Sequence, residues 1–205
     1  ETYKRFIRSG ALLQGSDKDR YSEINQEISK LSVQFSQNLL AETNNFEIIL
    51  GRDDLKGLPE DIINLAKEEA DNKYKKTSDT KYNNKYIFTT HRSSMYPFLT
   101  YSERRDLREK LYTGYIMRGD NNNEYDNKNI TSRIASLRVE KANILGFATH
   151  AQYVLDNTMA KTPDAVYELL DQLWEPALSR AKDELQELQK FVNKEGQNFK
   201  IASWD

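Results

Sequence analysis

Two histidines, His91 and His150, are the only imidazole side chains in this 205-residue sequence, which contains no cysteine. Neither histidine belongs to an H-E-x-x-H motif, which needs two histidines one helical turn apart to bind zinc. The absence of cysteine excludes thiolate nucleophiles, disulfides and cysteine-based zinc sites. Two imidazoles are too few for a multi-histidine metal centre, and the residues alone identify no substrate-binding position.

The surroundings of both histidines favour structural roles. His91 lies in the predicted loop 90–94, where a surface turn residue is the simpler interpretation and a role in gripping a ligand is the alternative. His150 follows a threonine at a predicted helix start, which indicates a structural or solvent-facing side chain. Spacing alone supports no Ser/His/Asp triad.

Two tripeptides match known signals but have structural explanations. The sequence Arg118-Gly119-Asp120 matches an adhesion signal, yet the glycine stands where a helix needs a cap, and an asparagine-rich loop follows. The sequence Asn129-Ile130-Thr131 fits the glycosylation pattern, yet it opens a predicted helix. We expect neither to act as a signal.

The basic and aromatic clusters also have structural explanations. The basic clusters 73–76 and 104–105 are flanked by acidic residues, which predicts solvated helix surface rather than phosphate binding. The aromatic segment 96–101 is predicted to be a loop leading into a helix, with core packing as the main role and groove lining as the alternative.

The balance of charge limits the classes of partner. There are 30 lysines and arginines against 32 acidic residues, a net charge of −2, which argues against a dedicated nucleic-acid binder. No stretch approaches the ~18 consecutive apolar residues of a membrane span. With 8 glycines and 4 prolines the chain has few places to turn, which predicts long helices.

Hydrophobic periodicity predicts a mostly α multi-helix domain with a small antiparallel β hairpin or sheet. Strands are predicted at about residues 46–50 and 85–90. Helices are predicted at 16–42, at 102–117, at 130–145, around 153–155, and at 162–196 with a bend at Pro176. A further short helix is predicted to begin with Pro59 at its first position and to bury Ile62, Ile63, Ala66 and Ala70. The segment 120–127 is predicted to be a solvated, mobile loop. Without internal repeats or a linker, residues 1–205 are expected to form a single helical unit.

Ordered blocks of the sequence resemble the thimet oligopeptidase family of zinc metallopeptidases. The blocks are SGALL at 9–13, LSVQFSQNLL at 31–40, LKGLP at 55–59, PFLTY at 97–101, RRDLREKLY at 104–112, LRVEKANILGF at 137–147 and MAKTPDAV at 159–166. The pair Trp204-Asp205 corresponds to a pair that precedes the family's catalytic half. EYDN at 124–127 and the MAKTP block favour the bacterial peptidyl-dipeptidase branch.

The resemblance implies a helical peptidase whose two halves enclose a deep channel, with zinc bound in the half that this sequence lacks. This chain would be the N-terminal, non-catalytic portion, inactive alone, and would form one wall of the channel. Its partners would be short peptides and the missing catalytic half, and zinc would be the cofactor of the longer protein. No catalytic or ligand residue of the family matches a position here.

Two alternatives to a peptidyl-dipeptidase stay open: a sister oligopeptidase that cleaves short peptides internally, and a helical binding module with no enzymatic role. A cytoplasmic location is expected, with the periplasm as the alternative. Separation from the catalytic half is also expected to leave an exposed apolar surface that favours self-association.

Overall fold

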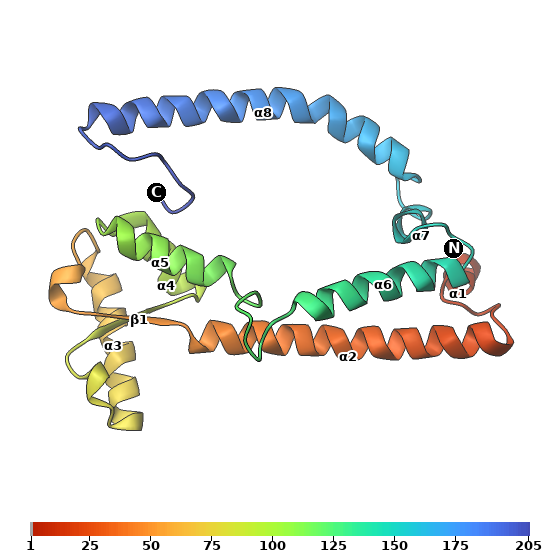
Figure 1. The fold of residues 1–205 in the computed structure, drawn as a ribbon, viewed down its shortest axis with the longest axis horizontal. Coiled ribbons are helices and arrows are strands. Elements are labelled where there is room, and N and C mark those ends of the chain that lie inside the picture. Colours follow the sequence, from red (N-terminus) through yellow and green to blue (C-terminus); the bar gives the residue numbers. More distant parts are fainter. Residues whose placement is uncertain (1) are drawn as a thin grey trace. The chain divides into compact units, whose positions relative to one another are not determined.

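The computed structural model describes residues 2–205, and their fold is mostly helical with one small sheet (Figure 1). The helices are α1 (Thr2–Arg8), α2 (Gly15–Asn45), α3 (Glu60–Thr77), α4 (Arg92–Tyr101), α5 (Arg105–Ile116), α6 (Lys128–Ile144), α7 (His150–Leu155) and α8 (Pro163–Lys194). The strands are β1 (Glu47–Leu50) and β2 (Tyr86–Thr89). The predicted fold class and both predicted strands are confirmed.

Contacts between residues divide the chain into two compact units. The first unit contains the residues up to Phe35 together with Lys128–Lys200, and the second contains Ser36–Asn127 together with Ile201–Asp205. The first division falls inside α2.

The core of the second unit is built on the hairpin of β1 and β2. The strands pair antiparallel, with Ile48 opposite Phe88. Helix α3 packs on β2, and α4 packs on both β2 and α5. The buried apolar side chains of this core come from all five elements and the connections between them: Ile48, Leu50, Leu55, Leu58, Ile63, Ala66, Phe88, Met95, Phe98 and Leu111.

Helix α3 begins one residue later than the sequence predicted. Pro59 has extended backbone (φ −62°, ψ 149°) and is the N-cap, so the helix starts at Glu60. Two acidic residues still occupy the first turn, where they favourably oppose the helix dipole. Ile63, Ala66 and Ala70 are buried, as the periodicity predicted, and Ile62 is half-buried.

The prediction of a loop at residues 96–101 is wrong, because these residues form the second half of α4 with Pro97 inside the helix. An internal proline removes one helical hydrogen bond. Burial offsets that loss, since Phe98 is fully buried and its ring centroid lies 4.6 Å from that of Phe88. The prediction of core packing is confirmed for Phe98, whereas Tyr96 and Tyr101 are exposed.

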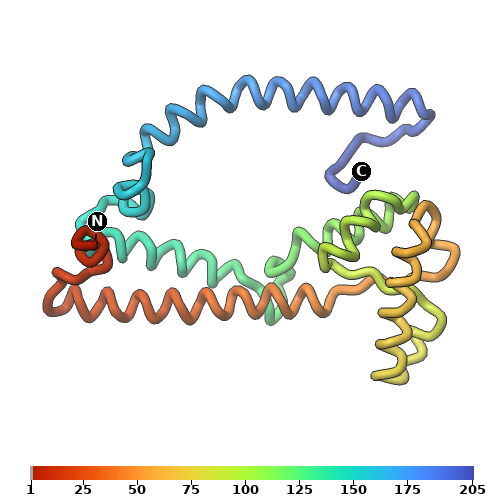
Figure 2. Tube along the Cα trace, turned by 180° about the vertical axis from the view of Figure 1, so that it is seen from behind, coloured from red at the N-terminus to blue at the C-terminus, as the bar shows by residue number. Residues whose placement is uncertain are grey.

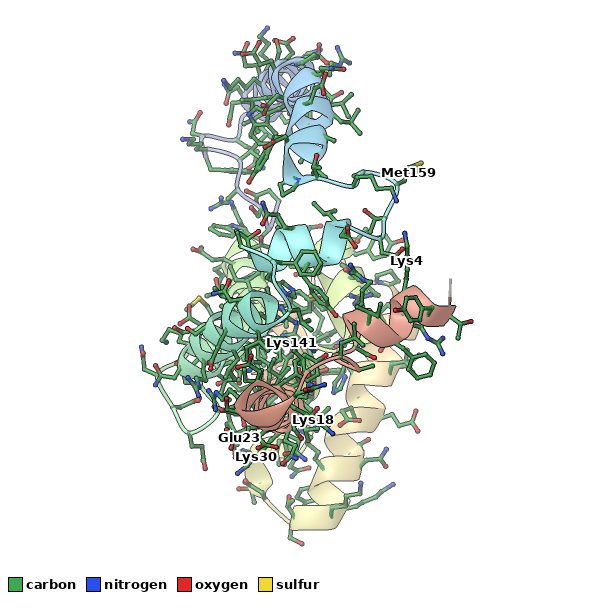
Figure 3. All side chains as sticks on the ribbon, turned by 90° about the vertical axis from the view of Figure 1, so that its right-hand side faces the viewer. Lys4, Lys18, Glu23, Lys30, Lys141 and Met159 are labelled. Carbon is green, nitrogen blue, oxygen red and sulfur yellow. The ribbon has the colours of Figure 1, made fainter. Side chains whose placement is uncertain are left out.

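In the first unit, α2 and α6 lie side by side (Figures 1 and 2). Ile24 of α2 and Leu137 of α6 are fully buried. Polar contacts line the pair: Arg20 Nε donates to Glu140 at 2.6 Å, Arg133 Nε donates to Glu27 at 2.6 Å, and Lys141 Nζ donates to Asn25 at 2.6 Å. Figure 3 labels Lys141 on α6 beside α2.

Helices α7 and α8 follow a glycine break, as predicted. Gly146 has a positive φ of 84°, and Thr149 caps α7 by accepting the N–H of Gln152. The segment between α7 and α8 carries Met159, which projects into solvent with 98% of its surface exposed (Figure 3). Helix α8 contains Pro176 and curves along its length (Figure 1).

Candidate functional site

The second unit contains a hollow of about 540 Å³ that is formed by the end of α2, by α5 and by the loop after α5. Its lining combines apolar and charged side chains: Glu42, Asn45, Phe46, Lys110, Thr113, Gly114, Met117, Arg118, Asn121, Asn123 and Tyr125. Helix α5 passes very close to Phe46 at Gly114, where a β-carbon would lie 2.1 Å from the ring. A glycine is therefore needed at the point where the two elements meet.

The carboxylate of Glu42 is the buried charge of this hollow, with only 6% of the residue exposed. It accepts the backbone N–H of Gly119, the Asn121 amide at 2.8 Å and the Asn123 amide at 2.6 Å. Burial raises the pKa of Glu42, but these three hydrogen bonds together lower it below its ordinary value. Glu42 is thus an ionised anchor for the loop and is poorly suited to carry protons.

The loop 120–127 differs from the solvated, mobile segment that the sequence predicted. Its first residues are exposed, but Asn121 and Asn123 are tied to Glu42, and Asn127 is buried and accepts a hydrogen bond from Asn38. The prediction missed these contacts because the partners on α2 are about 80 residues away in the sequence.

The tripeptide Arg118-Gly119-Asp120 lies in the turn that follows α5. Helix α5 ends at Ile116 with Met117 as its C-cap, so the predicted cap at Gly119 is wrong; Gly119 instead takes its positive φ of 80° in the buried turn that follows the helix. The Arg118 guanidinium donates to Thr43 Oγ1 at 2.9 Å and lies 3.9 Å from the centroid of the Tyr115 ring. These contacts hold the arginine against its own unit. Asn129 lies in the first turn of α6, where the sequence placed a helix start.

The two histidines lie in different units. His91 is the exposed N-cap residue of α4, makes no capping bond through its side chain, and borders a second hollow of about 440 Å³. His150 begins α7, and its ring centroid lies 6.2 Å from that of Tyr153, with the two rings tilted by 39°. Burial, together with the positive charges of Arg138 and Lys141, lowers the pKa of His150 and favours its neutral form.

The basic clusters do more than cover a solvated surface, which corrects the prediction. Lys73 and the Tyr82 hydroxyl both bind the Glu47 carboxylate on β1. Arg104 bridges Asp54 and Asp106. Lys73 and Arg104 therefore each tie two elements of the second unit together, whereas Lys75 and Lys76 are exposed, as predicted.

The segment 201–205 is held against α5 by two arginines. Arg105 and Arg108 each contact the Asp205 carboxylate at 2.9 Å, and Arg108 Nε donates to the Trp204 carbonyl at 2.9 Å. The Trp204 ring lies 6.0 Å from that of Tyr112. Burial raises the pKa of Asp205, but the arginines and the Ala202 N–H outweigh it and keep the carboxylate ionised.

Comparison with known proteins identifies the family. The profile of peptidase family M3 matches residues 98–205. This match covers more than half of the chain. The chain belongs to peptidase family M3.

Relatives of this M3 chain match it along almost its whole length. It is 37% identical over 205 residues to oligopeptidase A of Haemophilus influenzae, and 30% identical over 204 residues to dipeptidyl carboxypeptidase of Escherichia coli. It is also 30% identical over 209 residues to probable cytosolic oligopeptidase A of Arabidopsis thaliana. These matches cover 98%, 99% and 98% of the chain, and the chain spans 29% of the length of each relative. The predicted family resemblance is confirmed.

The zinc ion that the resemblance implies does not fit this part of an M3 protein. Within residues 2–205, no group of three or more histidine, aspartate or glutamate side chains is arranged to hold a metal ion. The buried carboxylates of Glu42 and Asp205 are instead occupied by amide and guanidinium donors. No helix in the described part of the chain is long and apolar enough to cross a membrane.

Proposed function

We propose that this chain is the N-terminal portion of a zinc-dependent peptidase that cleaves short peptides. The observation that carries the proposal is the alignment of nearly the whole chain with M3 peptidases, of which it spans 29%. In the longer protein, zinc and its ligands would belong to a catalytic part outside residues 1–205. The chain by itself would be inactive.

This portion would form one wall of a substrate channel. Long helices with few turns suit such a wall, because they extend a rigid surface beside an unfolded peptide. The ties through Glu42 and through Asp205 would keep the loop after α5 and the segment 201–205 fixed to the second unit. A narrow channel would exclude folded proteins and admit short peptides.

The sequence blocks favour removal of dipeptides from free C-termini, the activity named for the E. coli relative. Internal cleavage is the second candidate, and the 37% identity to an oligopeptidase A supports it. A peptide with an amidated C-terminus separates the two modes. A peptidyl-dipeptidase needs the free carboxylate and would leave this peptide intact, whereas an oligopeptidase would cut it.

The test of the proposal uses the full-length protein. We expect hydrolysis of short unfolded peptides, loss of activity after chelation of zinc, and recovery when zinc is added back. A full-length protein without an H-E-x-x-H motif, or one that binds peptides without cleaving them, would instead indicate a helical binding module.

A cytoplasmic location is proposed for the longer protein, with the periplasm as the alternative. The similarity to a relative named as cytosolic supports the first choice. Fractionation of cells that express the full-length gene distinguishes the two compartments.

A further inference from the structure

Helix α8 carries a long apolar face that no other described residue of the first unit covers. None of its residues is buried, although it has the most pronounced separation of apolar and polar faces in the chain. Exposed large side chains recur at spacings of three and four along one side, as in Tyr167, Leu170 and Trp174 and again in Leu185, Leu188 and Phe191. Between these two groups the face is continued by Ala177, Leu178 and Ala181. We call the following residues the α8 stripe: Tyr167, Leu170, Leu173, Trp174, Leu185, Leu188 and Phe191.

The α8 stripe has the character of an interface. Most of the stability of a protein helix comes from packing its apolar face, so a helix of this length is not expected to leave that face in water. Large contiguous apolar patches mark surfaces that bind other protein, and aromatic anchors dominate such contacts. Tyr167, Leu170, Leu173, Trp174 and Ala177 also surround a hollow of about 480 Å³ into which a side chain of a partner fits.

An acidic row runs along one edge of the stripe. Asp164, Glu168, Asp171 and Glu175 follow one another at spacings of four, three and four, which places them on the same side of the helix. Residues 163–179 contain no lysine or arginine. None of the four carboxylates forms an ion pair within residues 2–205. A complementary surface would be apolar, with lysine or arginine along one border.

We infer that the α8 stripe and its acidic row dock the remainder of the same polypeptide, which rests on the proposed function. The relatives are more than three times as long as this chain, so most of such a protein lies outside it. A second copy fits the charges less well. An antiparallel contact between two α8 helices, centred on the hollow, would set their acidic rows side by side, and like charges at an interface are unfavourable.

Two positions of α8 provide the test. Leu173 lies on the stripe and is 58% exposed, and Ser179 is also exposed but lies nine residues, or about two and a half turns, after Leu170, which places it on the opposite side of the helix. In the full-length protein, L173C and S179C are made separately, and the rate of maleimide labelling is measured without peptide, relative to the parent protein. We expect the thiol of L173C to react at least about tenfold more slowly than that of S179C, because docking covers only the stripe.

Charge is tested in the L173C background. The E168K/D171K double substitution should increase the labelling rate at position 173 severalfold, because it opposes a basic border. The single substitution D183K, on the other side of the helix, is the control and should leave the rate unchanged. Circular dichroism checks that each variant is folded.

Equal labelling of L173C and S179C would overturn the inference, and so would protection that disappears on tenfold dilution, which would indicate a second copy. No increase with E168K/D171K would overturn the role of the acidic row. Labelling needs neither substrate nor turnover. Protection in a protein that cleaves no peptide would therefore support the docking surface and contradict the proposed function. Rapid labelling of L173C in an active peptidase would support the proposed function and contradict the docking surface.

Discussion

Glu42 and Gly119 lie 77 residues apart in the sequence, and the Glu42 carboxylate accepts the backbone N–H of Gly119. Gly119 lies three residues beyond the end of α5 at Ile116, in the turn that follows the helix, and its N–H finds its acceptor on α2. The same carboxylate receives the Asn121 and Asn123 amides. One side chain of α2 therefore fixes where the loop after α5 goes.

Replacement of Glu42 by glutamine should destabilise the second unit by about 1–3 kcal/mol, because the amide group turns a donor toward buried donors that lose their acceptor. Hydrogen exchange at Gly119 should accelerate in E42Q, and urea unfolding should shift to lower concentration. E124Q is the control, since Glu124 is exposed in the same loop. Equal unfolding curves for E42Q and E124Q would contradict the anchoring role.

Glu42 also predicts how stability depends on pH. Its folded pKa lies below the ordinary value of 4.5, because the three hydrogen bonds outweigh the effect of burial. A depressed folded pKa stabilises the fold above the unfolded pKa, and this contribution is lost as the pH falls through the folded pKa. Thermal unfolding between pH 6 and pH 3 should therefore show a smaller loss of stability in E42Q than in the parent. A parallel decline in both proteins would assign the acid sensitivity to other carboxylates.

The contact between Gly114 and Phe46 predicts a destabilising G114A substitution. Alanine favours the helix by about 1 kcal/mol over glycine. Its β-carbon, however, would lie 2.1 Å from the Phe46 ring, and overpacking of this kind costs about 1–3 kcal/mol. We expect a net loss of stability in thermal unfolding. Adding F46L should restore part of it, and if G114A alone proves more stable than the parent, the close approach is not rigid.

The ion pair between Arg20 and Glu140 predicts a salt-dependent link between α2 and α6. The substitutions R20A and E140A should each lower the melting temperature, and the double variant should lose less than the sum of the two. Because both side chains are exposed, the coupling should shrink as sodium chloride is raised to 1 M. A coupling that does not change with salt would point to packing instead. K30A, on another exposed part of α2, serves as the control.

The sequence determined the helices, the two strands and the family, because these depend on local periodicity, turn chemistry and ordered blocks of residues. The spacing of Ile63, Ala66 and Ala70, for example, predicted the buried face of α3 correctly. Pro97 misled the prediction, since the cost of a proline inside a helix is local and the burial of Phe98 that offsets it is not.

Only the tertiary structure decided which charges are anchors. Glu42, Arg104 and Arg105 look like ordinary surface residues in the sequence, and their roles come from partners that are between 2 and 100 residues away. An ion pair or a buried carboxylate is defined by the distance between atoms and by exclusion of water, and the order of residues encodes neither directly. The α8 stripe is a further example. Periodicity predicts that α8 has an apolar face, but only the tertiary structure shows whether other residues cover that face.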